Sequence, residues 1–173
     1  LGDDTQLKWL EQQLKQKLEI KMRGTLGPDP QDMKQITVLN RVVTWETDRI
    51  TYEADQRHAD ITIDSLNLHT AKPVCTPGDT SNPDDPEGQR SLKQQEHRLF
   101  RALAARANYL ALDRPDLQFA VKEHCRAMSN PTRSDWDKLR RIAQYLVGAP
   151  RAVVHYTWQR PQDWLSGYSD SDW

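Results

Sequence analysis

The second half of the chain repeats an apolar residue every three or four positions in three successive segments, and no other feature constrains its fold as strongly. The first segment covers 92–112, and the second covers 115–128 and opens with Pro115, a residue suited to the first turn of a helix. The third covers 133–147 and is followed by Gly148, a typical helix terminator. Helices with one apolar stripe bury it against one another, so the sequence predicts a small helical bundle. The stripes consist of Leu99, Leu103, Ala107, Leu110, Phe119, Val121, Cys125, Met128, Trp136, Leu139, Ile142, Ala143 and Leu146.

The first half of the chain carries shorter patterns. Leucines at helical spacing predict an amphipathic helix over 6–18, with Thr5 as its N-cap and one face packed against the rest of the chain. Residues 19–27 predict a short strand, and the alternating β-branched and aromatic residues of 38–55 predict a hairpin with a polar turn. Asp55 then caps a further predicted helix, which ends before a proline-containing turn.

Residues 77–90 contain three prolines, two glycines and no large apolar side chain, so they predict a linker or mobile loop that cannot offset its ordering entropy by burial. Beyond the bundle, residues 152–158 and 166–173 predict two strands separated by a polar turn. The expected fold class is therefore α+β, with short antiparallel hairpins flanking a small helical bundle and a separate strand set at each end.

Charge is distributed unevenly along the chain, although the net charge is only −1. Residues 1–88 hold 10 Lys and Arg against 16 Asp and Glu, a net −6, whereas residues 89–160 hold 14 against 6, a net +8. A basic helical block of this kind is either a solvated surface or a surface that binds nucleic acid.

Other sequence features exclude several classes of protein. No run approaches the roughly 18 apolar residues that a membrane span needs, and no secretory leader opens the chain. Cys75 and Cys125 match no metal-binding spacing and predict free thiols in a reducing, intracellular compartment. The five histidines also lack the spacing of metal ligands.

Acidic residues stand near both ends of the sequence. The chain starts LGDD and finishes YSDSDW, which places Asp3 and Asp4 at one end and Asp170 and Asp172 at the other. Carboxylates at strand ends often hold metal ions, but Asp3 and Asp4 also fit a helix cap or a solvated acidic pair, and Asp170 fits an ordinary polar strand end.

Several short motifs recur in one known family. They are Lys-Pro-Val-x-Thr-Pro at 72–77, Tyr-Leu at 109–110, Arg-Pro-Asp at 114–116, Met-Ser-x-Pro-Thr at 128–132, Leu-x-Arg at 139–141 and Tyr-Leu-x-Gly at 145–148. Together with the hairpin that begins VLNRVVTW, they resemble the region between polymerase and RNase H in copia-type retrotransposon Pol polyproteins. The resemblance covers nearly the whole chain.

The resemblance implies one edge of each of two metal-dependent active sites. It places Asp3 and Asp4 in the aromatic-x-Asp-Asp box of an RNA-directed DNA polymerase and Asp170 on the first RNase H strand, where these catalytic residues would hold Mg²⁺. Leu1 departs from the pattern, because an aromatic residue is usual there. Two-metal chemistry needs further carboxylates, so the chain alone is expected to catalyse neither reaction.

The resemblance also implies a division of the chain. Residues 1–78 would form the end of the polymerase palm and a thumb-like segment, 79–91 a flexible acidic linker, 92–150 a helical connection bundle and 151–173 the truncated start of RNase H. The missing upstream polymerase and downstream RNase H segments would be its natural partners.

By this resemblance the chain grips an RNA–DNA hybrid or template–primer duplex behind the polymerase site. The basic side chains expected to meet phosphates are Arg126, Arg133, Lys138, Arg140 and Arg141. A structural role is expected for the Arg-Pro-Asp motif, in which Arg114 pairs with Asp116 or Asp113 to fix the turn at Pro115. The alternative is a non-catalytic retroelement remnant that acts as a structural or interaction subunit in a protein complex.

Overall fold

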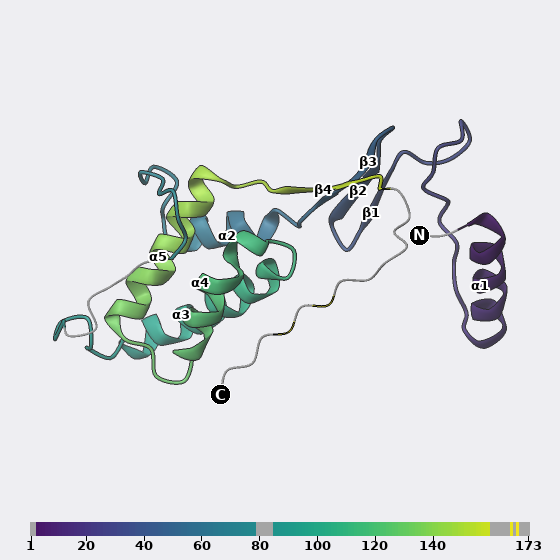
Figure 1. Cartoon of the computed structure of the whole chain (residues 1–173). Coiled ribbons are helices and arrows are strands. Elements are labelled where there is room, and N and C mark those ends of the chain that lie inside the picture. The colour runs from purple at the N-terminus through teal and green to yellow at the C-terminus, as the bar shows by residue number, and fades with distance from the viewer. Residues whose placement is uncertain (1–2, 79–84, 160–166, 168, 170–173) are drawn as a thin grey trace.

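The computed structural model describes residues 3–78, 85–159, 167 and 169, and shows a helical body joined to a small sheet, with one helix standing apart (Figure 1). The α+β class is confirmed. In chain order the elements are α1 Asp4–Lys17, β1 Gln35–Val38, β2 Arg41–Trp45, β3 Arg49–Glu53, α2 Arg57–Ser65, α3 Gln94–Ala111, α4 Pro115–Arg126, α5 Arg133–Gly148 and β4 Val153–Thr157. None of the described helices is long and apolar enough to cross a membrane.

The bundle predicted from the apolar periodicity is confirmed as α3, α4 and α5, with α2 packed against α3 and α5. Its core contains almost only helical side chains, because each helix buries one stripe. Pro115 occupies the first turn of α4, and Thr132 caps α5 by accepting a hydrogen bond from the backbone N–H of Asp135. The largest apolar side chains of this core are Phe100, Leu103, Leu110, Leu117, Val121, Trp136, Leu139, Ile142 and Leu146.

One predicted core residue lies on the surface instead. Phe119 is 75% exposed, because α4 buries Leu117, Val121 and His124, which recur at helical spacing on the opposite side of the helix. The prediction that Phe119 belongs to the core stripe is therefore wrong.

The sheet is fully antiparallel, with the strand order β1-β2-β3-β4. The predicted hairpin is confirmed as β2 and β3. The sequence did not predict β1, which reaches β2 through Leu39 and Asn40, both with positive φ (51° and 62°), as a two-residue type I′ turn requires. The predicted strand over 19–27 is wrong, since that segment makes only an isolated bridge between Leu26 and Met33.

The strand after the bundle joins the same sheet as the hairpin before it. β4 pairs with β3, so that Tyr52 lies opposite Val154 and Ile50 lies opposite Tyr156. The expectation of a separate strand set at each end is corrected, because the described strands form one sheet. Most of the predicted strand 166–173 falls outside the described residues.

Helix α1 confirms the predicted amphipathic helix but not its predicted environment. Its N-cap is Asp3 rather than Thr5, whose backbone N–H donates to the Asp3 carboxylate at 3.2 Å. None of its side chains is buried, and Leu7, Leu10 and Leu14 are 38–47% exposed. No other described helix or strand contacts α1, so its apolar face is not packed as expected.

Candidate nucleic-acid interface

The five basic residues predicted to meet phosphates lie on α4 and α5, but they do not form one continuous patch. Arg126 extends from α4, and its side chain is 72% exposed. Arg133 lies toward α3, within 3.8 Å of Glu96, while Lys138 and Arg141 lie three residues apart on the side of α5 that borders α4. The structure therefore brings together Lys138 and Arg141, while Arg126 pairs with Glu123 on α4. Arg133 lies elsewhere, and half-buried Arg140, two residues after Lys138, lies on another side of α5.

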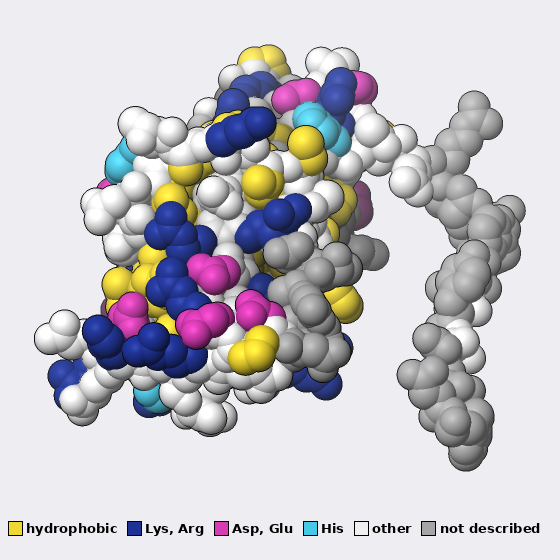
Figure 2. All heavy atoms as spheres, turned by 90° about the vertical axis from the view of Figure 1, so that its left-hand side faces the viewer, with side chains coloured by type: hydrophobic (Ala, Val, Ile, Leu, Met, Phe, Trp, Pro, Cys, Tyr) yellow, Lys and Arg dark blue, Asp and Glu magenta, His cyan; other side chains and the backbone are white. Residues whose placement is uncertain are grey.

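Acidic neighbours accompany most of these cations. Arg126 pairs with Glu123 at 3.0 Å, Lys138 is 3.9 Å from Asp135, and Arg133 is 3.5 Å from Asp137. Figure 2 shows the same mixture over one face of the helical body, where Lys and Arg side chains are interspersed with Asp and Glu. Exposed ion pairs of this kind contribute only about 0–1 kcal/mol each, so a phosphate can replace the acid as partner at little cost.

A groove lies between α4, α5 and residues 76–78, with a volume of about 580 Å³. Arg141 forms part of its wall: Nε donates to the carbonyl of Gly78 at 2.7 Å and Nη2 to the hydroxyl of Thr76 at 3.1 Å. Lys138, Glu123 and the exposed Phe119 also line this groove. We call it the α4–α5 groove.

His124 lies at the inner side of the α4–α5 groove and is only 2% exposed. Its ring packs against Phe100 with 4.4 Å between centroids, and neither ring nitrogen has a hydrogen-bond partner among the described residues. Burial lowers the pKa of His124 to about 4, so the ring is neutral at pH 7. In the sequence His124 is only one of five histidines without metal-ligand spacing, although its helical spacing from Leu117 and Val121 places it on the buried face.

The Arg-Pro-Asp motif fastens the start of α4 to the end of α5. Arg114 is 1% exposed and donates to both carboxylate oxygens of Asp116, at 3.0 and 2.7 Å. It also donates to the carbonyls of Ala149 (3.1 Å) and Pro150 (3.4 Å), just past the end of α5. Of the two partners considered for Arg114, Asp116 is the one observed.

The Asp116 carboxylate has a second donor, the hydroxyl of Tyr145 at 2.9 Å. Burial opposes ionisation of Asp116, but the hydrogen bonds from Arg114 and Tyr145 outweigh it and hold the pKa of Asp116 below its ordinary value. Burial, together with this hydrogen bond to the carboxylate, raises the pKa of Tyr145. The motif is thus a satisfied structural network at the point where the chain leaves α5 for β4.

Asp113 joins the sheet to the bundle. It lies in the turn between α3 and α4, where Arg41 of β2 donates to it at 2.6 Å and the hydroxyl of Tyr52 of β3 donates at 2.7 Å. Burial and then the hydrogen bond to Asp113 raise the pKa of Tyr52 to about 12. The Arg41 guanidinium also stands 5.1 Å from the ring centroid of Tyr109 on α3.

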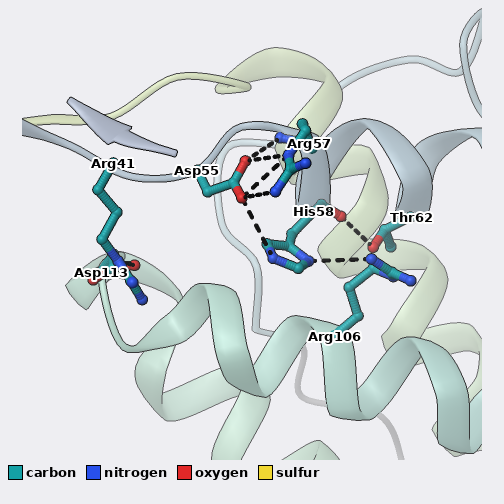
Figure 3. Close-up of polar contacts among 7 residues, drawn as sticks. All are labelled: Arg41, Asp55, Arg57, His58, Thr62, Arg106 and Asp113. Carbon is teal, nitrogen blue, oxygen red and sulfur yellow. Dashed lines mark hydrogen bonds and ion pairs between the residues drawn. The ribbon is translucent and has the colours of Figure 1, made fainter. Parts of the chain in front are cut away.

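A second polar cluster lies beside this junction at the start of α2 (Figure 3). Buried Asp55 accepts from the backbone N–H of Arg57 at 3.1 Å and from its guanidinium at 2.7 Å, which fits the predicted capping role of Asp55 although Gln56 occupies the N-cap position. Arg106 of α3 approaches Nδ1 of His58 at 3.2 Å. Burial lowers the pKa of His58, which favours the neutral ring that can accept this bond.

The carboxylates expected to hold Mg²⁺ do not form a metal site within the described part of the chain. Asp3 caps α1 and Asp4 lies in its first turn, while Asp170 and Asp172 lie outside the described residues. No group of three or more His, Cys, Asp or Glu side chains among the described residues is placed to hold a metal ion. Asp3 and Asp4 alone therefore supply no ligand set for Mg²⁺ among the described residues, and the metal role of Asp170 stays a prediction.

Comparison with known proteins supplies relatives for part of the chain. The retrovirus-related Pol polyprotein from transposon RE2 of Arabidopsis thaliana is 36% identical over 109 residues, and that from transposon RE1 is 34% identical over 113 residues. Each match covers 62% of this chain and 7% of the polyprotein. An uncharacterised mitochondrial protein of the same plant is 34% identical over 76 residues, which is 43% of this chain and 30% of that protein.

These relatives confirm that the chain resembles a retrotransposon Pol polyprotein and are consistent with the copia type. No family model matches the chain, and no solved structure matches it.

Proposed function

We propose that the chain is the part of a copia-type Pol polyprotein that lies between reverse transcriptase and RNase H, and that it holds the RNA–DNA hybrid or template–primer duplex during reverse transcription. The observation that carries this proposal is that Lys138 and Arg141 line one groove of the helical body and that Arg126 pairs with Glu123 of the same lining. Among the described residues, the partners of these three cations are surface acids or loop oxygens. The similarity to the Pol polyproteins of transposons RE1 and RE2 supplies the context.

Phosphate contact is the form of recognition that these side chains suit. Lys and Arg on helices bind phosphate oxygens without reading base sequence, and a reverse transcriptase has to hold every sequence that it copies. A structural Arg-Pro-Asp network behind the groove keeps α4 and α5 in fixed positions, since Arg114 contacts the ends of both helices. The proposal therefore gives the motif residues a positioning role and the exposed cations a binding role.

The metal role of Asp3, Asp4 and Asp170 remains part of the proposal for the whole polyprotein only. The carboxylates that complete either site would come from segments on either side of this chain, and Mg²⁺ would there activate the attacking group and stabilise the leaving group. The cap that Asp3 provides to α1 favours the alternative in which this acidic pair starts a helix.

The test is binding of a labelled RNA–DNA hybrid to the full chain, measured by fluorescence anisotropy at low salt. The double variant Arg126→Gln/Lys138→Gln is expected to bind at least fivefold more weakly, because each lost phosphate contact removes counterion release. A matched control, Lys8→Gln/Lys17→Gln, removes the same charge from α1 and is expected to change affinity less than twofold. Equal losses in both variants, or no binding by the unmodified chain, would contradict the proposal.

A second candidate function is supported by two open apolar surfaces. The leucine face of α1 is uncovered, and the described helices meet the sheet only at the junction of Arg41 and Tyr52 with Tyr109 and Asp113. Tyr156 and Trp158 on the β4 side of the sheet are 58% and 44% exposed. Such surfaces suit a protein partner, and an interaction subunit would need one. Hydrogen exchange would separate the candidates, because hybrid binding should protect α4 and α5 whereas a protein partner should protect α1 and the sheet.

A further inference from the structure

The α4–α5 groove has the size of a small-ligand site. Its volume of about 580 Å³ lies within the roughly 300–1,000 Å³ typical of ligand pockets and is too small to enclose a nucleic-acid duplex. It can accommodate one nucleotide unit. A nucleotide would need an aromatic surface for its base and cations for its phosphate.

An aromatic side chain stands on the α4 side of the groove. Phe119 is 75% exposed. A phenylalanine on the buried face of α4 would stabilise the fold more than one on the surface does. A flat apolar ring next to basic residues is the combination on which proteins stack unpaired bases. Phe119 can do this only with a base that is not already stacked inside a duplex.

Two cations stand on the α5 side. Thr76 and Gly78 hold Nη2 and Nε of Arg141, so the guanidinium is fixed while Nη1 has no hydrogen-bond partner among the described residues. Lys138 is 3.9 Å from Asp135, a distance at which its ammonium group is only weakly engaged. A phosphate between Arg141 and Lys138 would gain two charge-assisted contacts.

The remaining polar groups of the lining limit what can bind. Glu123 adds a negative charge that its pairing with Arg126 partly balances, which disfavours a second phosphate at the groove. His124 is neutral and both of its ring nitrogens are buried, so it adds no charge to the lining.

We propose that the α4–α5 groove binds one unpaired nucleotide of a single-stranded nucleic acid, with its base on the Phe119 ring and its phosphate at Arg141 and Lys138. This inference rests on the proposed function and extends it, because it adds an unpaired base on Phe119 to the phosphate contacts of Lys138 and Arg141. In the polyprotein such a strand would be the unpaired part of a template or a displaced strand.

The experiment compares the full chain and its Phe119→Ala variant in binding two labelled probes, a short single-stranded oligonucleotide and a blunt RNA–DNA hybrid of equal length. Loss of one stacked base is expected to weaken single-strand binding about tenfold or more and to leave hybrid binding within twofold. Phe119→Tyr keeps an aromatic face and should restore single-strand binding. Leu112→Ala, a control that removes another exposed apolar side chain, should change neither affinity.

The other outcomes distinguish failure of this inference from failure of the proposed function. If Phe119→Ala leaves single-strand binding unchanged, or weakens both probes equally, the inference is overturned while the proposed function survives. If the unmodified chain binds neither probe at low salt, the proposed function fails as well. Because Phe119 is exposed and outside the core, the alanine variant should unfold at the same urea concentration as the unmodified chain, which confirms that a loss of binding is local.

Discussion

At the scale of single residues, buried polar groups stabilise the fold more than the exposed charges that are conspicuous in the sequence. Arg114 is fully enclosed and makes four hydrogen bonds, whereas Arg126, equally charged, pairs only with a neighbouring glutamate at the surface. The sequence motif indicated a structural role for Arg114. It could not choose between Asp113 and Asp116 as partner, because that choice depends on Arg41, which lies 72 positions away from Asp113.

Arg114→Met is expected to lower the free energy of unfolding by about 2–4 kcal/mol, because it removes the charged partner of the Asp116 carboxylate and the donor to two carbonyls. Urea unfolding followed by circular dichroism measures the change. Arg126→Met, at an exposed arginine, should change the same quantity by no more than about 0.5 kcal/mol. Equal effects of the two substitutions would show that the Arg-Pro-Asp network is not structural.

His124 predicts a pH dependence of stability. Its folded pKa of about 4 lies below the ordinary value of 6.5, so the unfolded chain binds a proton that the folded chain excludes. The stability that this difference provides is complete above about pH 6.5 and declines as pH falls toward 4, by an amount on the order of 3 kcal/mol. Unfolding free energies measured at pH 7.5, 6 and 5 should fall in that order.

The variant His124→Leu should flatten this decline, whereas His69→Leu, at an exposed histidine, should keep it. His58, whose pKa is also lowered, contributes in the same direction and remains in both variants. A decline of the same size in His124→Leu would mean that His124 is not the group responsible.

At the scale of elements, the helices were predictable and much of the sheet was not. Apolar residues at helical spacing define α3, α4 and α5 locally, and the structure confirms all three. The pairing of β3 with β4 joins segments about a hundred residues apart, which no local pattern records. Likewise the leucines of α1 predict a helix but not whether anything covers them, and here no described element does.

The candidate site shows the same limit. The basic residues of α4 and α5 were named from the sequence because charge and helix position are local properties. The groove itself was not predictable, since it needs residues 76–78 to approach α5 and Phe119 to face outward. The predicted core position of Phe119 is wrong because α4 has two neighbouring rows of residues at helical spacing. The row that is buried contains Leu117, Val121 and His124 rather than Phe119.

The sheet is linked to the bundle through Asp113, so a change there should act on both elements. Asp113→Asn removes the charge that Arg41 and Tyr52 share, and faster amide exchange is expected in β2 and β3 with little change in α5. The pKa of Tyr52 should fall from about 12 toward 10 without reaching it, because burial is the larger cause of its rise.

Absorbance titration of tyrosine measures this pKa, with Asp137→Asn as the control at an exposed aspartate that pairs with Arg133. If Asp113→Asn leaves both the Tyr52 pKa and strand exchange unchanged, Asp113 does not couple the sheet to the bundle.

At the scale of the whole molecule, the chain divides by charge as well as by structure. The acidic first half supplies α1, three strands and α2, and the basic second half supplies the three helices of the bundle. This division, together with the Pol polyprotein relatives, favours a module that holds nucleic acid on its helical side and leaves α1 and the sheet for contacts with protein. The chain spans 7% of the length of those two relatives.

The central claim is that basic side chains of the bundle bind nucleic-acid phosphates, and salt dependence tests it most directly. Binding of an RNA–DNA hybrid to the full chain should weaken by about tenfold to a hundredfold between 50 and 200 mM salt, as counterion release from about two to four phosphates requires. Affinity that stays constant over this range, or no detectable binding at 50 mM salt, would contradict the account.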